Sequence, residues 1–391
     1  MPDIMTKRYK FLIPLFITIL PLLVVVSCSK DNNTGTPTKT TTTTATPTKL
    51  GLYEQSEIVG VDSPTYRVLF MTVPKIGTQT LSDQIDGLVF DTGSGGLVID
   101  ANGILPPSMI TTSGFNFTGD STVVDGITIT NQSQTIVYGD DASTDVTVYG
   151  NLCYADVTLG EPTDAVITVK RLPFFMYYKA VDGNGNDEPA GEFDVLGVNS
   201  EYDIAFSNGA TVGSPFASFS PGTGLTKGFK MDALGTGNFS TSDEVPLTSG
   251  VLTIGLTAAD IASTSAYKFT QLTYDATDGA VPVVPSTITY NSQTFNAYVI
   301  YDSGTDPYNY IESNSATKNT TTQLPTGVAV AVKSTGTSFE YPFTTSATDY
   351  ITYVENPSSS GTNVSILSLE YFLDNGYLID YPDHKLGLKN N

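Results

Sequence analysis

The chain has 391 residues, 40% of them hydrophobic, with 40 acidic against 18 basic side chains and a formal net charge of −22. Such a length is enough for two lobes with separate cores. Because a polyanionic protein is repelled by phosphates, nucleic acid is not an expected partner. With two cysteines and one histidine (His384), the chain lacks the ligands of a zinc site and the usual parts of a nucleophilic triad. We therefore expect no metal and no cofactor, and any hydrolysis must depend on carboxylates.

The first 27 residues have the pattern of a secretory signal, a basic start followed by the apolar stretch 11–26. The stretch ends in Val25-Val26-Ser27-Cys28, which resembles the lipobox of bacterial lipoproteins. In that family the peptide is cut before the cysteine, which is then acylated. The resemblance implies a lipid on Cys28 and a place in the bacterial cell envelope, on the outer membrane or the cell surface. An ordinary signal peptide and a permanent membrane span are the alternatives.

Residues 28–50 are rich in threonine and proline and show no apolar periodicity, so they are predicted to form an extended tether. From residue 51 onward, short runs alternate apolar and polar side chains between turn residues, as in 66–70 and 127–130. No segment longer than about two turns carries a helical stripe. The body is predicted to be all-β, and with Cys28 lipidated, Cys153 is left without a disulfide partner.

Two short runs interrupt this pattern, and each is an apolar strand that delivers an aspartate into a tight turn. They are Asp91-Thr92-Gly93-Ser94 and Asp302-Ser303-Gly304-Thr305. They lie 211 residues apart (302 − 91), and no other Asp-[Ser/Thr]-Gly occurs in the body. One such run is more often a polar turn than a catalyst, but a duplicated one indicates paired carboxylates.

Paired carboxylates can hydrolyse an amide without metal, histidine or cysteine. Two carboxyls held close together share one proton, so the pair supplies both the base that activates water and the acid that protonates the carbonyl oxygen. The two glycines permit the tight turn, and the hydroxyls that follow can donate to the aspartates or brace the loops. The predicted roles are catalysis for Asp91 and Asp302 and support of the pair for Thr92, Gly93, Ser94, Ser303, Gly304 and Thr305.

On these motifs the chain resembles the pepsin family of bilobal aspartic proteases over residues 66–388. Further segments fit in the family's order: 137–140 and 149–160 resemble the flap hairpin, 193–197 a strand under the first catalytic loop, and 366–388 the closing strands. The resemblance implies two β-barrel-like lobes, 51–232 and 233–391, with the active-site cleft between them. It also implies a monomeric endopeptidase whose substrate is a protein or peptide, with Tyr138 and Gly139 on the flap over that substrate.

Four departures from the family's pattern are visible. The chain has no tryptophan, and Val98 stands where the family has the one that bonds the flap tyrosine. The flap hairpin is longer, Asp306 follows the second motif where a small residue is usual, and Ser368-Leu369 replaces Gly-Asp. We expect these changes to affect the flap and substrate preference more than the dyad.

Other interpretations stay open. Residues 182–186 begin like a calcium loop but lack its later ligands, which favours a surface turn. Tyr308 and Tyr310 could line a substrate subsite, although packed tyrosines are commoner. A noncatalytic lipoprotein that binds a peptide or glycan in the same cleft is the alternative function, and a surface adhesin is a third. Neither needs two adjoining carboxylates.

Overall fold

The computed structural model describes residues 45–58, 63–81, 87–138, 145–242, 245–318, 320–357 and 362–391. The predicted signal peptide, Cys28, most of the tether and Gly139 lie outside the described residues. Within the described ranges, no helix is long and apolar enough to cross a membrane. The domain boundary at residue 232 stays a prediction.

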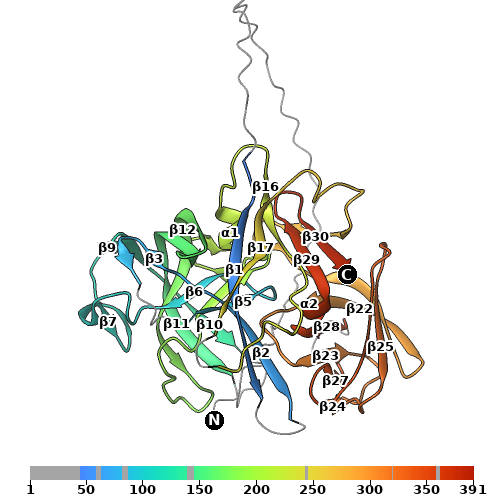
Figure 1. Cartoon of the computed structure of the whole chain (residues 1–391). Helices are drawn as coiled ribbons and strands as arrows, with labels where there is room; N and C mark the ends of the chain where they lie inside the picture. The colour runs from blue at the N-terminus through green and yellow to red at the C-terminus, as the bar shows by residue number, and fades with distance from the viewer. Residues whose placement is uncertain are drawn as a thin grey trace, which may run out of the picture.

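The larger of the two main sheets holds sixteen strands of the described chain. They are β1 (Thr48–Ile58), β2 (Thr65–Met71), β3 (Lys75–Ile76), β4 (Gln79–Thr80), β5 (Leu88–Asp91), β6 (Gly95–Asp100), β9 (Ser121–Val124), β10 (Ile127–Tyr138), β11 (Val146–Glu161), β12 (Ala165–Val181), β13 (Val195–Val198), β16 (Thr226–Met231), β17 (Leu247–Leu256), β18 (Lys268–Gln271), β29 (Asn375–Asp380) and β30 (Lys385–Asn390). The end of the chain therefore returns to this sheet, where β29 pairs with β16 (Figure 1).

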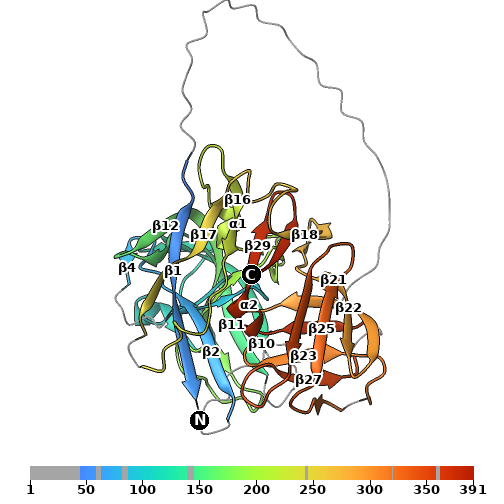
Figure 2. The same cartoon turned by 45° about the vertical axis from the view of Figure 1, so that its right-hand side comes forward.

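The second main sheet holds eight strands, all from the later part of the chain. They are β21 (Val284–Tyr290), β22 (Gln293–Tyr301), β23 (Tyr308–Glu312), β24 (Thr322–Gln323), β25 (Ala329–Ser334), β26 (Glu340–Thr344), β27 (Ile351–Glu355) and β28 (Val364–Leu367). In Figure 2 this sheet forms the orange and red half of the molecule, beside the blue and green half. The two halves match the bilobal prediction.

Short elements complete the described chain. Three two-stranded pairs are β7 (Ile110–Thr111) with β8 (Gly114–Phe115), β14 (Ile204–Ala205) with β15 (Thr211–Val212), and β19 (Tyr274–Asp275) with β20 (Gly279–Ala280). The helices are α1 (Pro215–Ser218), α2 (Glu370–Asp374) and the 3-10 turn η1 (Pro107–Met109). Helices this short confirm the prediction of an all-β body.

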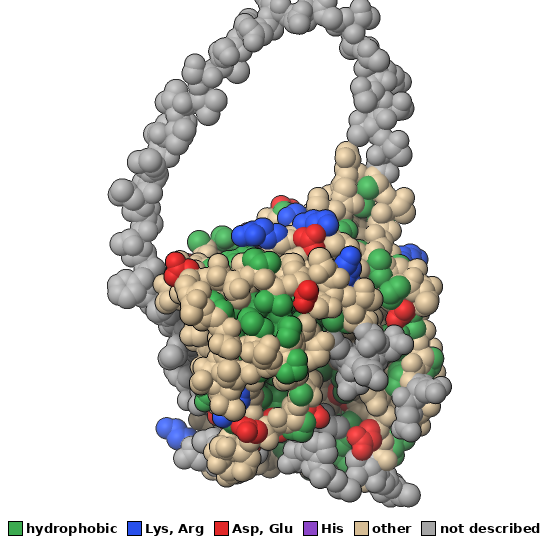
Figure 3. Space-filling view, turned by 90° about the vertical axis from the view of Figure 1, so that its left-hand side faces the viewer, with side chains coloured by type: hydrophobic (Ala, Val, Ile, Leu, Met, Phe, Trp, Pro, Cys, Tyr) green, Lys and Arg blue, Asp and Glu red, His purple; other side chains and the backbone are tan. Residues whose placement is uncertain are grey.

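Alternation of apolar and polar side chains explains which faces are buried. Along β21, for example, Val284, Ser286, Ile288 and Tyr290 are buried, while the residues between them are more exposed. β5 and β13 are instead buried on nearly all sides, since β5 lies between β2 and β13 in the interior. On the face at the left of Figure 1, shown in Figure 3, charged side chains are few and scattered, as the composition predicts.

The segment predicted to lie under the first motif, 193–197, and the start of the predicted closing strands, 366–388, lie beside the two motifs. β13 runs parallel to β5, so that Gly197 is opposite Asp91. In the second lobe β28 runs parallel to β22, so that Leu367 is opposite Tyr301, the residue before Asp302. Each motif thus lies at the end of a strand that has a parallel neighbour.

Candidate active site

Asp91 is the last residue of β5, and Asp302 directly follows β22. Both are buried, with exposed fractions of 0% and 1%. A buried carboxylate is costly unless hydrogen bonds replace its hydration. The two turns supply such bonds.

Each turn binds its own aspartate in the same way. Asp91 accepts the Gly93 N–H on Oδ1 at 2.8 Å and the Ser94 hydroxyl on Oδ2 at 2.6 Å. Asp302 accepts the Gly304 N–H on Oδ1 at 2.7 Å and the Thr305 hydroxyl on Oδ2 at 2.8 Å. Gly93, Ser94, Gly304 and Thr305 thus contact the two aspartates directly, and their role in catalysis stays a prediction.

The two middle residues of the motifs bond across to each other. The Thr92 N–H donates to Ser303 Oγ at 3.1 Å, and the Ser303 N–H donates to Thr92 Oγ1 at 2.9 Å. Each hydroxyl in turn donates to the other motif's strand, Thr92 to the Tyr301 carbonyl and Ser303 to the Phe90 carbonyl, both at 2.8 Å. Four buried hydrogen bonds thus join two loops that are far apart in sequence.

The motif glycines bring the carboxyls together. A Cβ added to Gly93 would lie 2.4 Å from Cγ of Asp302, and one added to Gly304 would lie 2.7 Å from Cγ of Asp91. No side chain fits in either place, because such contacts are far shorter than van der Waals distance. Glycine is required here for close approach of the opposing carboxyl.

The two carboxyls are electrostatically coupled. The pKa of Asp302 is raised well above its usual value, first by burial, then by the negative charge of Asp91 and by a hydrogen bond with that carboxyl. Two adjoining carboxyls titrate as a unit, so one proton stays on the pair at a pH where a solvated aspartate is ionised.

Tyr138, predicted to lie on the flap, ends β10 and is 5% exposed. Its ring stacks on Phe193, with centroids 6.2 Å apart and planes 12° from parallel, in an apolar cluster that includes Val98. Burial raises the pKa of Tyr138, and so do the charges of Asp91, Asp203 and Asp194. The tyrosine is therefore close to the dyad, but its ring packs within the lobe, and Val98 lies in the same cluster.

The aromatic residues after the second motif are packed together. Tyr308 shares a hydroxyl–hydroxyl bond of 2.8 Å with Tyr66, and Tyr310 stacks on Tyr353 with centroids 5.7 Å apart. The 182–186 segment is a turn in which Asp182 accepts the N–H groups of Asn184 and Asn186. No group of three potential metal-ligating side chains occurs among the residues that the structure describes.

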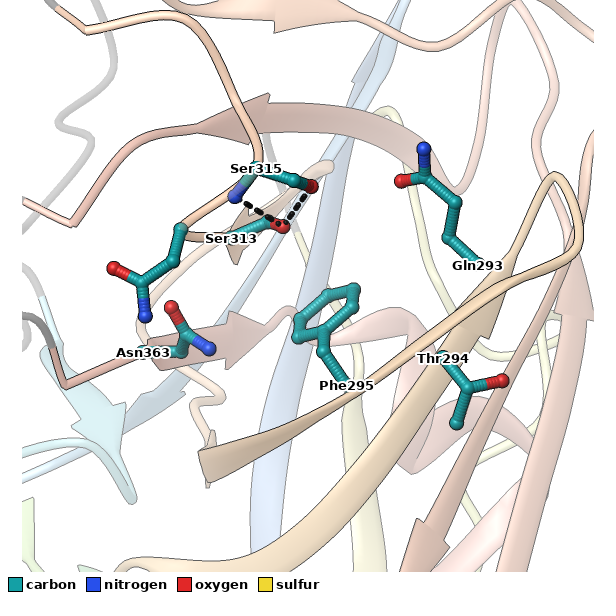
Figure 4. A pocket seen from close by; sticks show the side chains of 7 residues that line it. Gln293, Thr294, Phe295, Ser313, Ser315 and Asn363 are labelled. Carbon is teal, nitrogen blue, oxygen red and sulfur yellow. Dashed lines mark hydrogen bonds between the residues drawn. The ribbon is translucent and has the colours of Figure 1, made fainter.

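A separate pocket of about 440 Å³ lies in the second lobe, where the start of β22 meets the segment after β23 (Figure 4). Neither dyad residue contributes to it. It is lined by Gln293, Thr294, Phe295, Ser313, Asn314, Ser315 and Asn363. The hydroxyls of Ser313 and Ser315 bond each other at 2.7 Å there.

Sequence reasoning missed a set of charged residues around the second motif. Arg67 on β2 donates its backbone N–H to Asp306 at 2.6 Å, and its guanidinium lies 3.7 Å from Glu370. A signal was available, because Arg67 is a lone charge within the strand-like run 65–71. In the sequence, Asp306 stands out only because a small residue is usual at that place in the family that the chain resembles.

No family model and no curated protein matches the chain. Among solved structures, an aspartic proteinase from Irpex lacteus matches with a TM-score of 0.51 and 17% identity, over 88% of this chain and 98% of that one. At 17% sequence identity, this similarity is evidence about the fold alone. The chain has the bilobal, all-β fold of the pepsin-like aspartic proteinases.

Proposed function

We propose that this protein is an aspartic endopeptidase in which Asp91 and Asp302 activate a water molecule for peptide-bond hydrolysis. The observation that carries the proposal is the mutual contact of the motifs, in which the glycine of each turn lies against the other turn's carboxyl. The likeness in fold to an aspartic proteinase supports the same reaction class.

The reaction needs one proton on the pair, as in the aspartic-protease dyad that serves as the model for such sites. The ionised carboxyl takes a proton from the water, whose oxygen attacks the peptide carbonyl carbon. The protonated carboxyl gives its proton to the carbonyl oxygen. Collapse of the tetrahedral intermediate breaks the C–N bond. The leaving nitrogen takes a proton from one carboxyl, and a hydroxyl of the intermediate returns its proton to the other, so the pair again holds one proton. Since the shared proton is lost as pH rises, activity is expected in acid.

Substrate must reach carboxyls that are buried. With Asp91 and Asp302 at 0% and 1% exposed, side chains that cover the dyad have to move before a peptide binds. An extended peptide bound by strand-like backbone hydrogen bonds is the expected substrate form, because the surrounding elements are strands.

The test compares the full chain with Asp91→Asn and Asp302→Asn on an unfolded protein substrate across acid pH. We expect cleavage by the wild type and a loss of at least about a thousandfold in each variant, because an amide can neither share the proton nor activate water. Equal cleavage by all three proteins would contradict the proposal. Peptide binding without cleavage by any of them would instead favour a noncatalytic binder.

We also propose that the protein is held in a bacterial envelope through a lipid on Cys28. The sequence Val25-Val26-Ser27-Cys28 after an apolar stretch is what supports this. Expressed in a bacterial host, the wild type should fractionate with membranes, and its first mature peptide should carry the mass of the acyl chains. Cys28→Ser should be soluble and unacylated. Membrane association of both proteins would contradict the lipid anchor.

A further inference from the structure

A second pair of buried carboxyls lies beside the dyad, and the proposed reaction does not use it. Asp306 is 8% exposed and directly follows Thr305, whose hydroxyl bonds Asp302. Glu370 is 0% exposed and begins α2, near the middle of the molecule (Figure 1). The backbone joins them closely, because the Leu369 N–H donates to the Thr305 carbonyl at 2.8 Å.

One cation from the other lobe faces this pair. Arg67 lies on β2, the antiparallel neighbour of β5, which carries Asp91. Its backbone N–H donates to Asp306 Oδ2, and its guanidinium Nη1 is 3.7 Å from Glu370 Oε1. Its Nη2 bonds Asp349 at 2.8 Å. With only 9% of its side chain exposed, Arg67 connects the strand beside the first motif to the residue after the second.

The hydrogen bonding calls for a proton between the carboxyls. Asp306 Oδ1 and Glu370 Oε1 are both buried and have no donor among the described residues. Two carboxyls can bond each other only when one of them is protonated, and one shared proton would satisfy both atoms. The pair would then carry one negative charge instead of two near Arg67, which also faces Asp349, and this lowers the cost of burying the carboxyls.

The electrostatics agree with this geometry. Burial and the charge of Glu370 raise the pKa of Asp306 well above its usual value, more than Arg67 lowers it. Burial raises the pKa of Glu370 to about 7, although Ser368, Asp306 and Arg67 act in the opposite direction. The other charged or titratable groups that face the pair are Asp349, Tyr350, Tyr341 and Asp374.

We propose that Arg67, Asp306 and Glu370 form a clamp between the lobes, with one proton shared by the two carboxyls, that positions Asp302 against Asp91. The expected effect on catalysis rests on the proposed endopeptidase function. The proton shared by Asp306 and Glu370 does not depend on that function. The clamp touches no substrate, so its members are positioning residues. The Ser368 hydroxyl adds a further contact to the pair, because it donates to Glu370.

The catalytic arm of the test uses Arg67→Met in the full chain. This change leaves the backbone bond from residue 67 to Asp306 in place but removes the positive charge that faces Glu370. Helix α2 and the Asp302 turn beside it should therefore shift, and kcat at acid pH should fall by about 10- to 100-fold while KM changes by less than about twofold. Arg67→Lys should recover part of the loss, since it restores the charge. The control is Lys230→Met, which removes the cation of another partly buried ion pair, 2.6 Å from Asp260, in which neither motif takes part.

Equal kcat in Arg67→Met and Lys230→Met, with similar loss of thermal stability, would reduce Arg67 to an ordinary structural residue and overturn the clamp. Inactivity of the wild type and of Asp91→Asn alike would overturn the proposed function instead. The second arm stays informative in either case, because it does not measure activity.

The second arm compares the unfolding temperatures of the wild type and Glu370→Gln between about pH 4.5 and about pH 7. Over this interval the folded protein keeps the Glu370 proton, whereas the unfolded chain releases it. A group whose pKa is raised by folding stabilises the protein at low pH and loses that effect as pH rises. The wild-type unfolding temperature should therefore fall over this interval, and Glu370→Gln should fall less. Identical slopes would overturn the shared proton.

Discussion

Thr92 and Ser303 hold each other by two reciprocal hydrogen bonds, of 3.1 Å and 2.9 Å, in which the backbone N–H of each donates to the hydroxyl of the other. Both residues are buried and come from turns of different lobes. The bonds set the separation of the aspartates that precede them. Any change at this junction should therefore affect both the stability and the proposed reaction.

Ser303→Ala should destabilise the protein and reduce activity together. The change leaves the Thr92 N–H and the Phe90 carbonyl without their buried partners, at a cost of roughly 1–3 kcal/mol for each unsatisfied group. Chemical denaturation at the pH of best activity measures the loss. Ser303→Thr, which keeps the hydroxyl, should lose less. A stability equal to that of the wild type in Ser303→Ala would contradict the role of this junction.

Gly93→Ala and Gly304→Ala should abolish cleavage, because each new methyl would occupy the place of the opposing carboxyl. We expect a loss of at least about a hundredfold in kcat, the scale for a displaced catalytic group. The control is Gly237→Ala, since nothing lies within 4 Å of a Cβ at that position. Circular dichroism checks that the variants fold. Wild-type activity in Gly93→Ala or Gly304→Ala would contradict the close approach of each motif glycine to the opposing carboxyl.

Glu54→Gln should make stability less dependent on pH. Burial raises the pKa of Glu54 to about 7 from 4.5, so the folded protein binds its proton more tightly than the unfolded chain does. Stability linked to Glu54 is then complete below about pH 4.5 and is lost as pH rises through about 7. Thermal unfolding at these two pH values measures the slope. Glu57→Gln, an exposed change on the same strand, should keep the wild-type slope.

Cys153 should resist alkylation in the folded protein. It is 0% exposed, and burial raises the pKa of its thiol, so the reactive thiolate is both scarce and inaccessible. In a Cys28→Ser background, iodoacetamide should label Cys153 only after denaturant is added. Labelling at the same rate in native and denatured protein would contradict the burial of this thiol.

The sequence by itself determined the all-β class and the two motifs. Alternating runs specify strands locally, and Asp-Thr-Gly-Ser and Asp-Ser-Gly-Thr can be recognised because each turn binds its own aspartate within three residues. Only the tertiary structure decided what lies across from each motif. The contact of Gly93 with Asp302, the stacking of Tyr138 on Phe193, and the clamp of Arg67 with Asp306 and Glu370 join residues from separate elements. Such contacts depend on how the sheets pack against each other, and the local pattern of residues along one strand does not determine that packing.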